Sequence, residues 1–240
     1  MKSTRTKDTT RARTHMDAES GVLDPDAGLK SNLVTVLCLI SFLSMSAFSQ
    51  MSPFYPLKAK EKGIDGIWVG FIFGTMALMQ ILSSAIVGKY LHKTAGRGKI
   101  IMMGSFLIIC QTSLLGYLHF EDDQTRFLLF SFLAQMLGGF GAGANSTASM
   151  AILSSFDVSE REENIGYIEA ANGIGMLFGP LLGALLYTIG GYFMPFATFT
   201  VIYLLSMPYI VLVLNRSRKI YQRSAVEPTF AGVPFQPKEL

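Results

Sequence analysis

The sequence has few charged residues for its size. Only 15% of its 240 residues are Asp, Glu, Lys or Arg, against about 25% in ordinary soluble domains. Five stretches, which together make up 153 residues, contain a single charged side chain, Glu169. These stretches are residues 31–57, 66–88, 100–120, 127–156 and 164–215. A helix or sheet that faces water cannot be covered with so little polarity, so the sequence excludes a soluble globular domain.

Cysteine is scarce too, and the excess of positive charge is small. Two cysteines in 240 residues exclude a disulfide-rich scaffold. The net charge is +3, and the basic residues lie beside apolar stretches, which argues against a nucleic-acid-binding protein. What the sequence does have is long apolar runs, and the hydrocarbon core of a membrane is the environment that demands them.

The lengths of these runs predict six membrane-spanning helices. A bilayer core takes about 20 apolar residues per helix, so four of the stretches give one span each. The stretch 164–215 is too long for one span, and the turn signal Gly190-Gly191 splits it into two. The predicted spans are 32–56, 67–89, 100–120, 127–156, 164–189 and 192–214. We therefore expect an all-α, polytopic membrane protein, with tails at 1–30 and 215–240 around a six-helix domain at 31–214.

Basic residues are distributed unequally between the two sides of these spans. Sixteen of the 20 Lys and Arg residues fall in the two tails and in the second and fourth connections, and four fall in the other connections. The positive-inside rule therefore predicts that both termini are cytoplasmic. We expect an integral, multi-pass protein, and the sequence leaves vesicular, vacuolar and plasma membranes as alternatives.

The fifth predicted span contains small residues at a regular spacing. Gly175, Gly179 and Gly183 recur every four residues, which makes a shallow groove that another helix can approach closely. Pro180 removes one helical hydrogen bond and can bend the helix. Tight helix packing is the favoured interpretation, and a surface that closes against a second half of the protein is the other.

Polar residues gather on one face of the first and fourth spans. They are Ser46, Ser49 and Gln50 in the first span, and Gln135, Gly138, Gly139, Ala142, Asn145, Ser146 and Ser149 in the fourth. Polar faces in hydrocarbon must meet protein or water, so these two faces either line a shared aqueous cavity or hydrogen-bond between helices. Gln80 and Gln111, near the middles of the second and third spans, are interpreted as packing contacts.

Glu169 is the one ionisable carboxylate within the predicted spans. A charge inside a membrane is costly, so such a residue is a functional candidate that binds a cation or carries a proton. However, Glu169 lies about 7 Å along the helix axis from Asn164. That depth also suits an interfacial group favoured by the helix N-terminus, so both interpretations stay open.

Several motifs together resemble those of the major facilitator superfamily. The run Gly175 to Gly183 is similar to the antiporter motif of its helix 5, Gly-x-x-x-Gly-Pro-x-x-Gly. The segment Gly88 to Lys99 is similar to its signature between helices 2 and 3, Gly-x-Leu-x-Asp-Arg-x-Gly-Arg-Lys. The matched positions in that signature are Gly88, Lys93, Gly96, Arg97 and Lys99.

The run Ser52 to Gly63 and the pair Ile168-Glu169 look closest to the vesicular amine and polyamine transporter branch. Two positions depart from the family pattern. His92 stands where the helix 2–3 signature has Asp, and Gln135 stands where the helix-4 motif often begins with Arg.

The resemblance implies the N-terminal six-helix half of a twelve-helix transporter, with the substrate path between two halves. It implies exchange of a small organic solute, an amine at the level of the branch, for protons. The implied substrate- and proton-binding residues are Glu169, Asn145, Gln135, Gln50, Ser46 and Ser49. The implied partners are the solute, the lipid bilayer and a second half or a second copy.

No nucleic acid, metal or cofactor is expected. The spans contain no catalytic dyad or metal-ligand cluster, so we do not expect an enzyme. The alternative function is a transport-inactive half that binds or regulates a full-length transporter.

Overall fold

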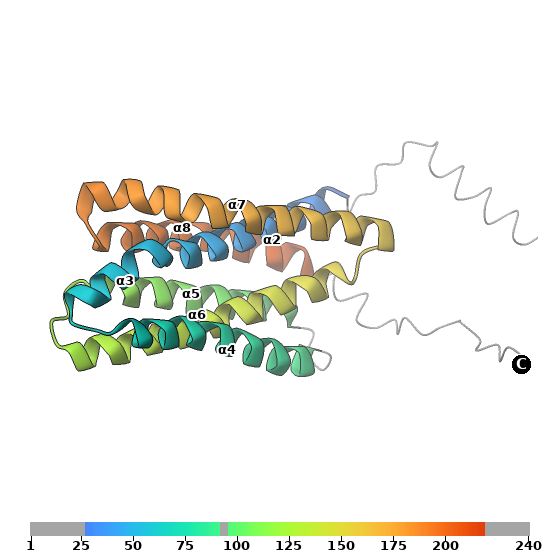
Figure 1. Ribbon diagram of the computed structural model, residues 1–240. Helices are drawn as coiled ribbons and strands as arrows, with labels where there is room; N and C mark the ends of the chain where they lie inside the picture. The colour runs from blue at the N-terminus through green and yellow to red at the C-terminus, as the bar shows by residue number, and fades with distance from the viewer. Residues whose placement is uncertain (1–26, 92–95, 219–240) are drawn as a thin grey trace, which may run out of the picture.

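The computed structural model describes residues 27–91 and 96–218, and these residues are helical apart from short connections. The helices are α2 (Ala27–Ser49), α3 (Met51–Glu61), α4 (Gly66–Leu91), α5 (Arg97–Tyr117), α6 (Gln124–Leu153), α7 (Val158–Gly190) and α8 (Phe193–Arg216) (Figure 1). Because α2 and α3 make up one span, six helices are long and apolar enough to cross a membrane. The predicted all-α fold with six spans is confirmed.

Most helices extend beyond their predicted spans, and α7 and α3 show how charged residues continue a helix. α7 begins at Val158 rather than at 164, and the added turns contain Glu and Arg, which favour helix. Glu160 in the first turn is also favoured by the helix dipole. At the other end of the bundle α3 continues to Glu61, past Lys58 and Lys60. The loss of apolar residues therefore predicts where a span leaves the hydrocarbon, but not where its helix ends.

The first span is interrupted at Gln50, between α2 and α3. Pro53 and Pro56 have no backbone N–H, so the carbonyls of Ser49 and Ser52 lose their helical donors. Proline is tolerated in the first turn of a helix, which explains why α3 can restart at Met51.

The fifth and sixth spans are joined at the predicted glycine turn. α7 ends at Gly190, and Gly191 has a φ of +64°, a conformation that residues with a side chain rarely adopt. The N–H of Gly191 donates to the carbonyl of Tyr187 at 2.8 Å and closes the last turn of α7. The predicted split of the long apolar stretch at Gly190-Gly191 is confirmed.

The helices form two layers, with α2, α7 and α8 in one and α4, α5 and α6 in the other (Figure 1). Within the second layer, α6 packs against both α4 and α5. A Cβ on Gly143 would lie 2.5 Å from the carbonyl oxygen of Gln80 in α4, and one on Gly141 would lie 2.6 Å from that of Gly104 in α5. The α6 backbone therefore lies directly against both neighbouring helices.

The two layers are joined chiefly through α5 and α8, which run antiparallel. The Thr200 hydroxyl donates to that of Thr112 at 2.9 Å across this contact. We call the end of the bundle where α2 begins at Ala27 and α8 ends at Arg216 the termini end. The opposite end, where α3 ends at Glu61 and α7 at Gly190, is the loop end (Figure 1).

Candidate functional site

A cleft lies between the two layers where α2, α4, α6 and α7 converge, and we call it the central cleft. It has a volume of about 80 Å³. Its lining consists of Ile40, Ser41, Ser44, Met45, Gln80, Ala142, Asn145, Ser146, Ser149, Met150, Ile168 and Asn172. Hydroxyl and amide side chains from all four helices reach it, and none of the lining side chains is charged. The cleft therefore offers neutral hydrogen-bonding groups to whatever enters it.

The polar face predicted on the fourth span supplies one wall of this cleft. Asn145, Ser146 and Ser149 of α6 all line it. From the first span, however, the cleft takes Ser41 and Ser44 rather than the predicted polar cluster. Sequence reasoning missed these two serines, although their spacing of three residues places them on one helix face.

The predicted cluster on the first span contacts α7 instead of the cleft. The Ser46 hydroxyl donates to the carbonyl of Gly175 at 3.1 Å, and the Ser49 hydroxyl donates to the same oxygen at 3.3 Å. Gln50 is fully buried, and its amide oxygen and nitrogen have no hydrogen-bond partner among residues 27–91 and 96–218. For Ser46 and Ser49, the structure thus shows hydrogen bonding between helices.

The three glycines of the antiporter motif are buried against the first span, Gly175 and Gly179 against α2 and Gly183 against α3. A Cβ on Gly175 would lie 2.5 Å from the carbonyl oxygen of Phe42. One on Gly179 would overlap the Ser49 hydroxyl. One on Gly183 would lie 2.8 Å from a ring carbon of Phe54.

These glycines therefore bring the backbones of α2 and α7 together, which is the tight packing that their spacing favours. The first span covers them within this six-helix unit, and their role in closing against a second half stays a prediction. Pro180, beside them, is partly buried.

Gln135 belongs to a buried contact between helices rather than to the cleft. Its Oε1 accepts a hydrogen bond from Nε2 of Gln111 in α5 at 3.0 Å. Its Nε2 contacts the sulfur of Met51 in α3 at 2.8 Å. These contacts tie α3, α5 and α6 together inside the bundle, and they place Gln111 in the packing role predicted for it.

A hydrogen-bond network lies behind the central cleft. Asn145 donates from Nδ2 to the Ser105 hydroxyl of α5 at 3.3 Å. The Ser44 hydroxyl pairs with the hydroxyl of Tyr203 in α8 at 2.9 Å, and Tyr203 also interacts with Ser105. Two cleft residues are thus held in place by groups from α5 and α8, helices that do not line the cleft themselves.

Glu169 lies at the rim of the central cleft. Its side chain is exposed, and its Oε2 accepts from Nδ2 of Asn172 at 3.5 Å. Asn172 lines the cleft, so this contact places the carboxylate beside the opening. In the described part of the chain, no Lys or Arg lies within ion-pair distance of Glu169.

The residues of the helix 2–3 signature lie around the connection between α4 and α5. Gly96 precedes α5, and its carbonyl accepts from the N–H of Ile100 at 3.1 Å. Arg97 is partly buried and Lys99 is exposed, while Gly88 lies near the end of α4. Lys93 and His92 lie outside the described residues. None of the described members of this signature lines the central cleft.

A larger groove of about 660 Å³ lies between α2 and α7 at the termini end. Its charged groups are already engaged: Lys30 pairs with Glu160 at 3.4 Å, and the Tyr167 hydroxyl donates to Glu163 at 2.6 Å. Two helices supply most of its wall, whereas four helices converge on the central cleft. We therefore take the central cleft, with Glu169 at its rim, as the candidate functional site.

Comparison with known proteins identifies a protein family and several proteins of similar sequence. The family profile described as Major Facilitator Superfamily matches residues 29–238. The MFS-type transporter SLC18B1 of Rattus norvegicus is 33% identical over 208 residues, which cover 85% of this chain and 45% of that protein. Its Homo sapiens counterpart is 32% identical over 171 residues, which cover 71% of this chain and 37% of that protein.

A bacterial relative matches as well. The Multidrug resistance protein MdtG of Citrobacter koseri is 32% identical over 162 residues, or 65% of this chain and 38% of that protein. The chain thus spans less than half the length of these curated relatives. The family match covers most of the chain and agrees with the motifs and the six helices, so the chain belongs to the Major Facilitator Superfamily.

Proposed function

We propose that this chain forms one six-helix half of a secondary active transporter that exchanges a small organic amine for protons. The observation that carries the proposal is the central cleft, which is lined by neutral polar side chains from four helices and has Glu169 at its rim. Membership of the Major Facilitator Superfamily supports transport in general. The run Ser52 to Gly63 and the pair Ile168-Glu169, which resemble the amine branch, support the finer assignment.

The volume of the central cleft supports the view that it forms only part of a substrate-binding site. A cavity that binds benzene has a volume of about 150 Å³, so the 80 Å³ of the central cleft is too small for an organic solute with its ring or chain. In transporters built from two repeats, the substrate lies at the interface between the repeats. We therefore assign the rest of the binding volume to a second six-helix half, or to a second copy of this chain, packed over the cleft.

A single carboxylate at the rim gives a physical basis for exchange. An ionised Glu169 attracts an ammonium group, whereas a protonated Glu169 does not. One carboxylate thus binds either the cationic solute or the proton, and release of one favours binding of the other. Asn172, Asn145 and the cleft serines then supply hydrogen bonds that orient the solute.

Uptake of labelled spermidine into vesicles that contain this chain, with an imposed proton gradient, tests the proposal. We expect uptake to stop when the gradient is collapsed and to be lost in Glu169→Gln. The matched control is Glu162→Gln, which removes an exposed carboxylate from the same helix and should leave uptake unchanged. Uptake that Glu169→Gln leaves intact would remove Glu169 from the mechanism.

The same preparation tests the alternative of a regulatory half. If the chain gives no uptake alone but co-purifies with a larger transporter and changes that transporter's rate, a transport-inactive regulator is the correct function. We also propose that residues 1–30 and 215–240 are cytoplasmic tails, as the distribution of Lys and Arg predicts. A thiol introduced by Arg218→Cys should then react with an impermeant reagent only from the cytoplasmic side, and one introduced by Lys60→Cys only from the opposite side.

A further inference from the structure

Three basic side chains at the termini end have no acidic partner among residues 27–91 and 96–218. Lys99 lies near the start of α5, and Arg216 and Arg218 lie at the end of α8. All three are exposed, and no Asp or Glu among the described residues lies within ion-pair distance of them. Neither α5 nor α8 contains an acidic residue, so no side chain of these two helices offsets the positive charge of the three.

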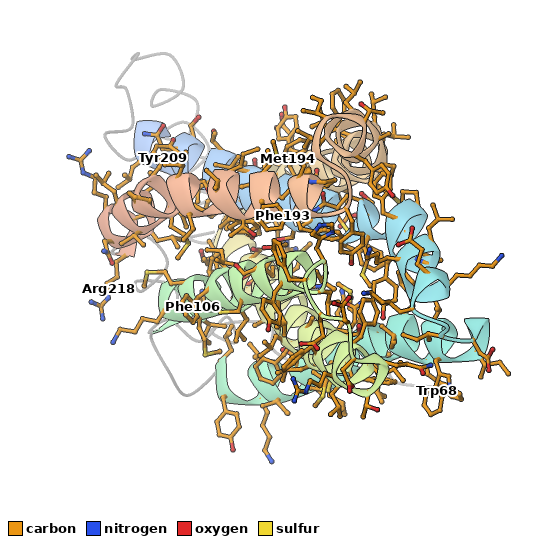
Figure 2. The ribbon with its side chains drawn as sticks, turned by 90° about the vertical axis from the view of Figure 1, so that its left-hand side faces the viewer. Trp68, Phe106, Phe193, Met194, Tyr209 and Arg218 are labelled. Atoms are coloured by element: carbon orange, nitrogen blue, oxygen red, sulfur yellow. The ribbon has the colours of Figure 1, made fainter. Side chains whose placement is uncertain are left out.

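The packing of α5 on α8 brings these cations to one corner of the bundle. The two helices are antiparallel and in contact where Thr112 meets Thr200 and where Gly116 lies beside Phe196. The start of α5 therefore lies beside the end of α8. Figure 2 shows Arg218 at this corner, beyond the end of α8 and on the side of the molecule where Phe106 projects from α5.

Large apolar side chains continue from this corner along the same outer faces of α5 and α8. Phe106 is 58% exposed and lies seven residues after Lys99, which is two helical turns and about 10 Å further along the same face. Tyr209 is 44% exposed and lies seven residues before Arg216, so it stands at the same depth on α8. Positive charge at the end of the bundle suits the headgroup of a phospholipid, and the exposed rings about 10 Å further along the helices suit its acyl chains.

The acidic residues that the structure describes at this end lie on another helix. Asp157, Glu160, Glu162 and Glu163 are all at or just before the start of α7, and Glu160 is paired with Lys30 of α2. α7 packs on α2 and α8, whereas strong contact between α7 and α5 is absent from the described residues. Among the described residues of the termini end, the acidic side chains thus lie on or next to α7, and α5 and α8 contribute basic side chains alone.

At the loop end, two basic side chains form ion pairs with acidic residues. Lys62 pairs with Asp122 at 2.6 Å, and Lys58 pairs with Glu61 at 2.9 Å. The Lys62 ammonium holds the pKa of the Asp122 carboxyl below its usual value. Lys58 and Lys62 thus pair with acids, whereas Lys99, Arg216 and Arg218 have no such partner in the described ranges.

We propose that the α5–α8 corner of the termini end binds the headgroup of an anionic phospholipid. Lys99, Arg216 and Arg218 contact its phosphate and carboxylate groups, and the exposed faces around Phe106 and Tyr209 hold its acyl chains. The positive-inside rule requires only that basic residues lie on one side of the membrane. It does not require that they share one corner, in which the described residues include no acid, next to exposed rings. The helix dipole favours Arg216 in the last turn of α8, but it does not favour Lys99 near the start of α5.

Lipid binding can be measured on the whole chain in nanodiscs of phosphatidylcholine with and without phosphatidylserine, by native mass spectrometry of the bound lipids. We expect wild-type protein to retain phosphatidylserine over phosphatidylcholine. One basic side chain near an anionic surface contributes about fivefold in affinity, so the triple variant Lys99→Gln/Arg216→Gln/Arg218→Gln should bind phosphatidylserine about a hundredfold more weakly.

The matched control removes three cations from the loop end, as Lys58→Gln/Lys60→Gln/Arg126→Gln, and should keep the preference for phosphatidylserine. Equal loss in both triple variants would overturn the proposal, because net charge rather than the corner would then set the preference. Equal retention of both lipids by the wild type would also overturn it. Competition by soluble inositol phosphate as strong as by phosphatidylserine would show a free-anion site and overturn the lipid assignment.

A pair of uncharged variants tests the contribution of the rings. Phe106→Ala/Tyr209→Ala keeps every cation, and it should shorten the residence of phosphatidylserine while the preference over phosphatidylcholine remains. If the triple charge variant fails to fold, the single variants Lys99→Gln and Arg218→Gln give the same readout, with about a fivefold loss expected for each. No change in either single variant would again contradict the proposal.

Discussion

Two groups of polar residues in the same helices have different roles. Ser46, Ser49 and Gln135 hydrogen-bond between helices and do not reach the central cleft, whereas Ser41, Ser44 and Asn145 lie on its wall, two of them also bonded to α5 or α8. Both groups consist of hydroxyl and amide side chains, and both occur on α2 and α6. The comparison teaches that the direction of a side chain, rather than its polarity, decides whether it serves packing or a site.

The largest effect is expected where packing depends on the absence of a side chain. Gly179→Ala places a methyl group against Ser49 and 2.5 Å from the carbonyl oxygen of Ser46, so α2 and α7 must separate. We expect a loss of about 1–3 kcal/mol in stability, measured as a lower unfolding temperature in detergent.

Gly173→Ala is the control for this variant. A Cβ on Gly173 meets no atom within 4 Å, and alanine favours helix over glycine. The control should be as stable as the wild type or slightly more stable. Equal destabilisation by both variants would show that helix backbone effects, and not the α2–α7 contact, set the result.

An intermediate effect is expected in the buried polar contact. Gln135→Leu leaves the Gln111 amide without its 3.0 Å partner inside the bundle, and it should cost about 0.6–2 kcal/mol. The double variant Gln111→Leu/Gln135→Leu removes both amides and should recover most of that loss, because no buried polar group is left unpaired. Uptake per folded molecule should stay near the wild-type value in the double variant, and a complete loss of uptake would move Gln135 into the site.

The smallest effect on stability is expected in the central cleft. Ser149 lines it, and its hydroxyl has no hydrogen-bond partner within the described ranges, so Ser149→Ala should change stability by less than about 0.5 kcal/mol. The same variant should raise the KM for spermidine about fivefold, the equivalent of one hydrogen bond. An unchanged KM together with a clear loss of stability would place Ser149 in the packing group.

The fold could be predicted in most respects because hydrocarbon imposes a strong pattern on sequence. One charge in 153 residues is enough to place six spans, and Gly190-Gly191 is enough to separate the last two. The start of α7 at Val158 was not predicted, because charged helix formers continue the helix outside the apolar stretch. The interruption at Gln50 was also missed, although Pro53 and Pro56 carry the signal for it.

The site was predictable only as a set of candidates. Small and polar residues at steps of three and four identified the correct face of α6 but did not show which face of α2 it meets. That depends on how α7 covers α2, and a sequence without contacts does not give the rotation of one helix against another. Glu169 could be found from its charge alone, but its link to the cleft through Asn172 required the structure.

The glycines of α6 have a mechanical consequence. Gly141 and Gly143 leave no side chain between the α6 backbone and the carbonyls of α5 and α4, so even a small shift of one helix brings backbone atoms into collision. The layer of α4, α5 and α6 should therefore resist sliding of its helices past one another. A change in the width of the central cleft is then expected to involve α2 and α7, the two helices of its wall that lie outside that layer.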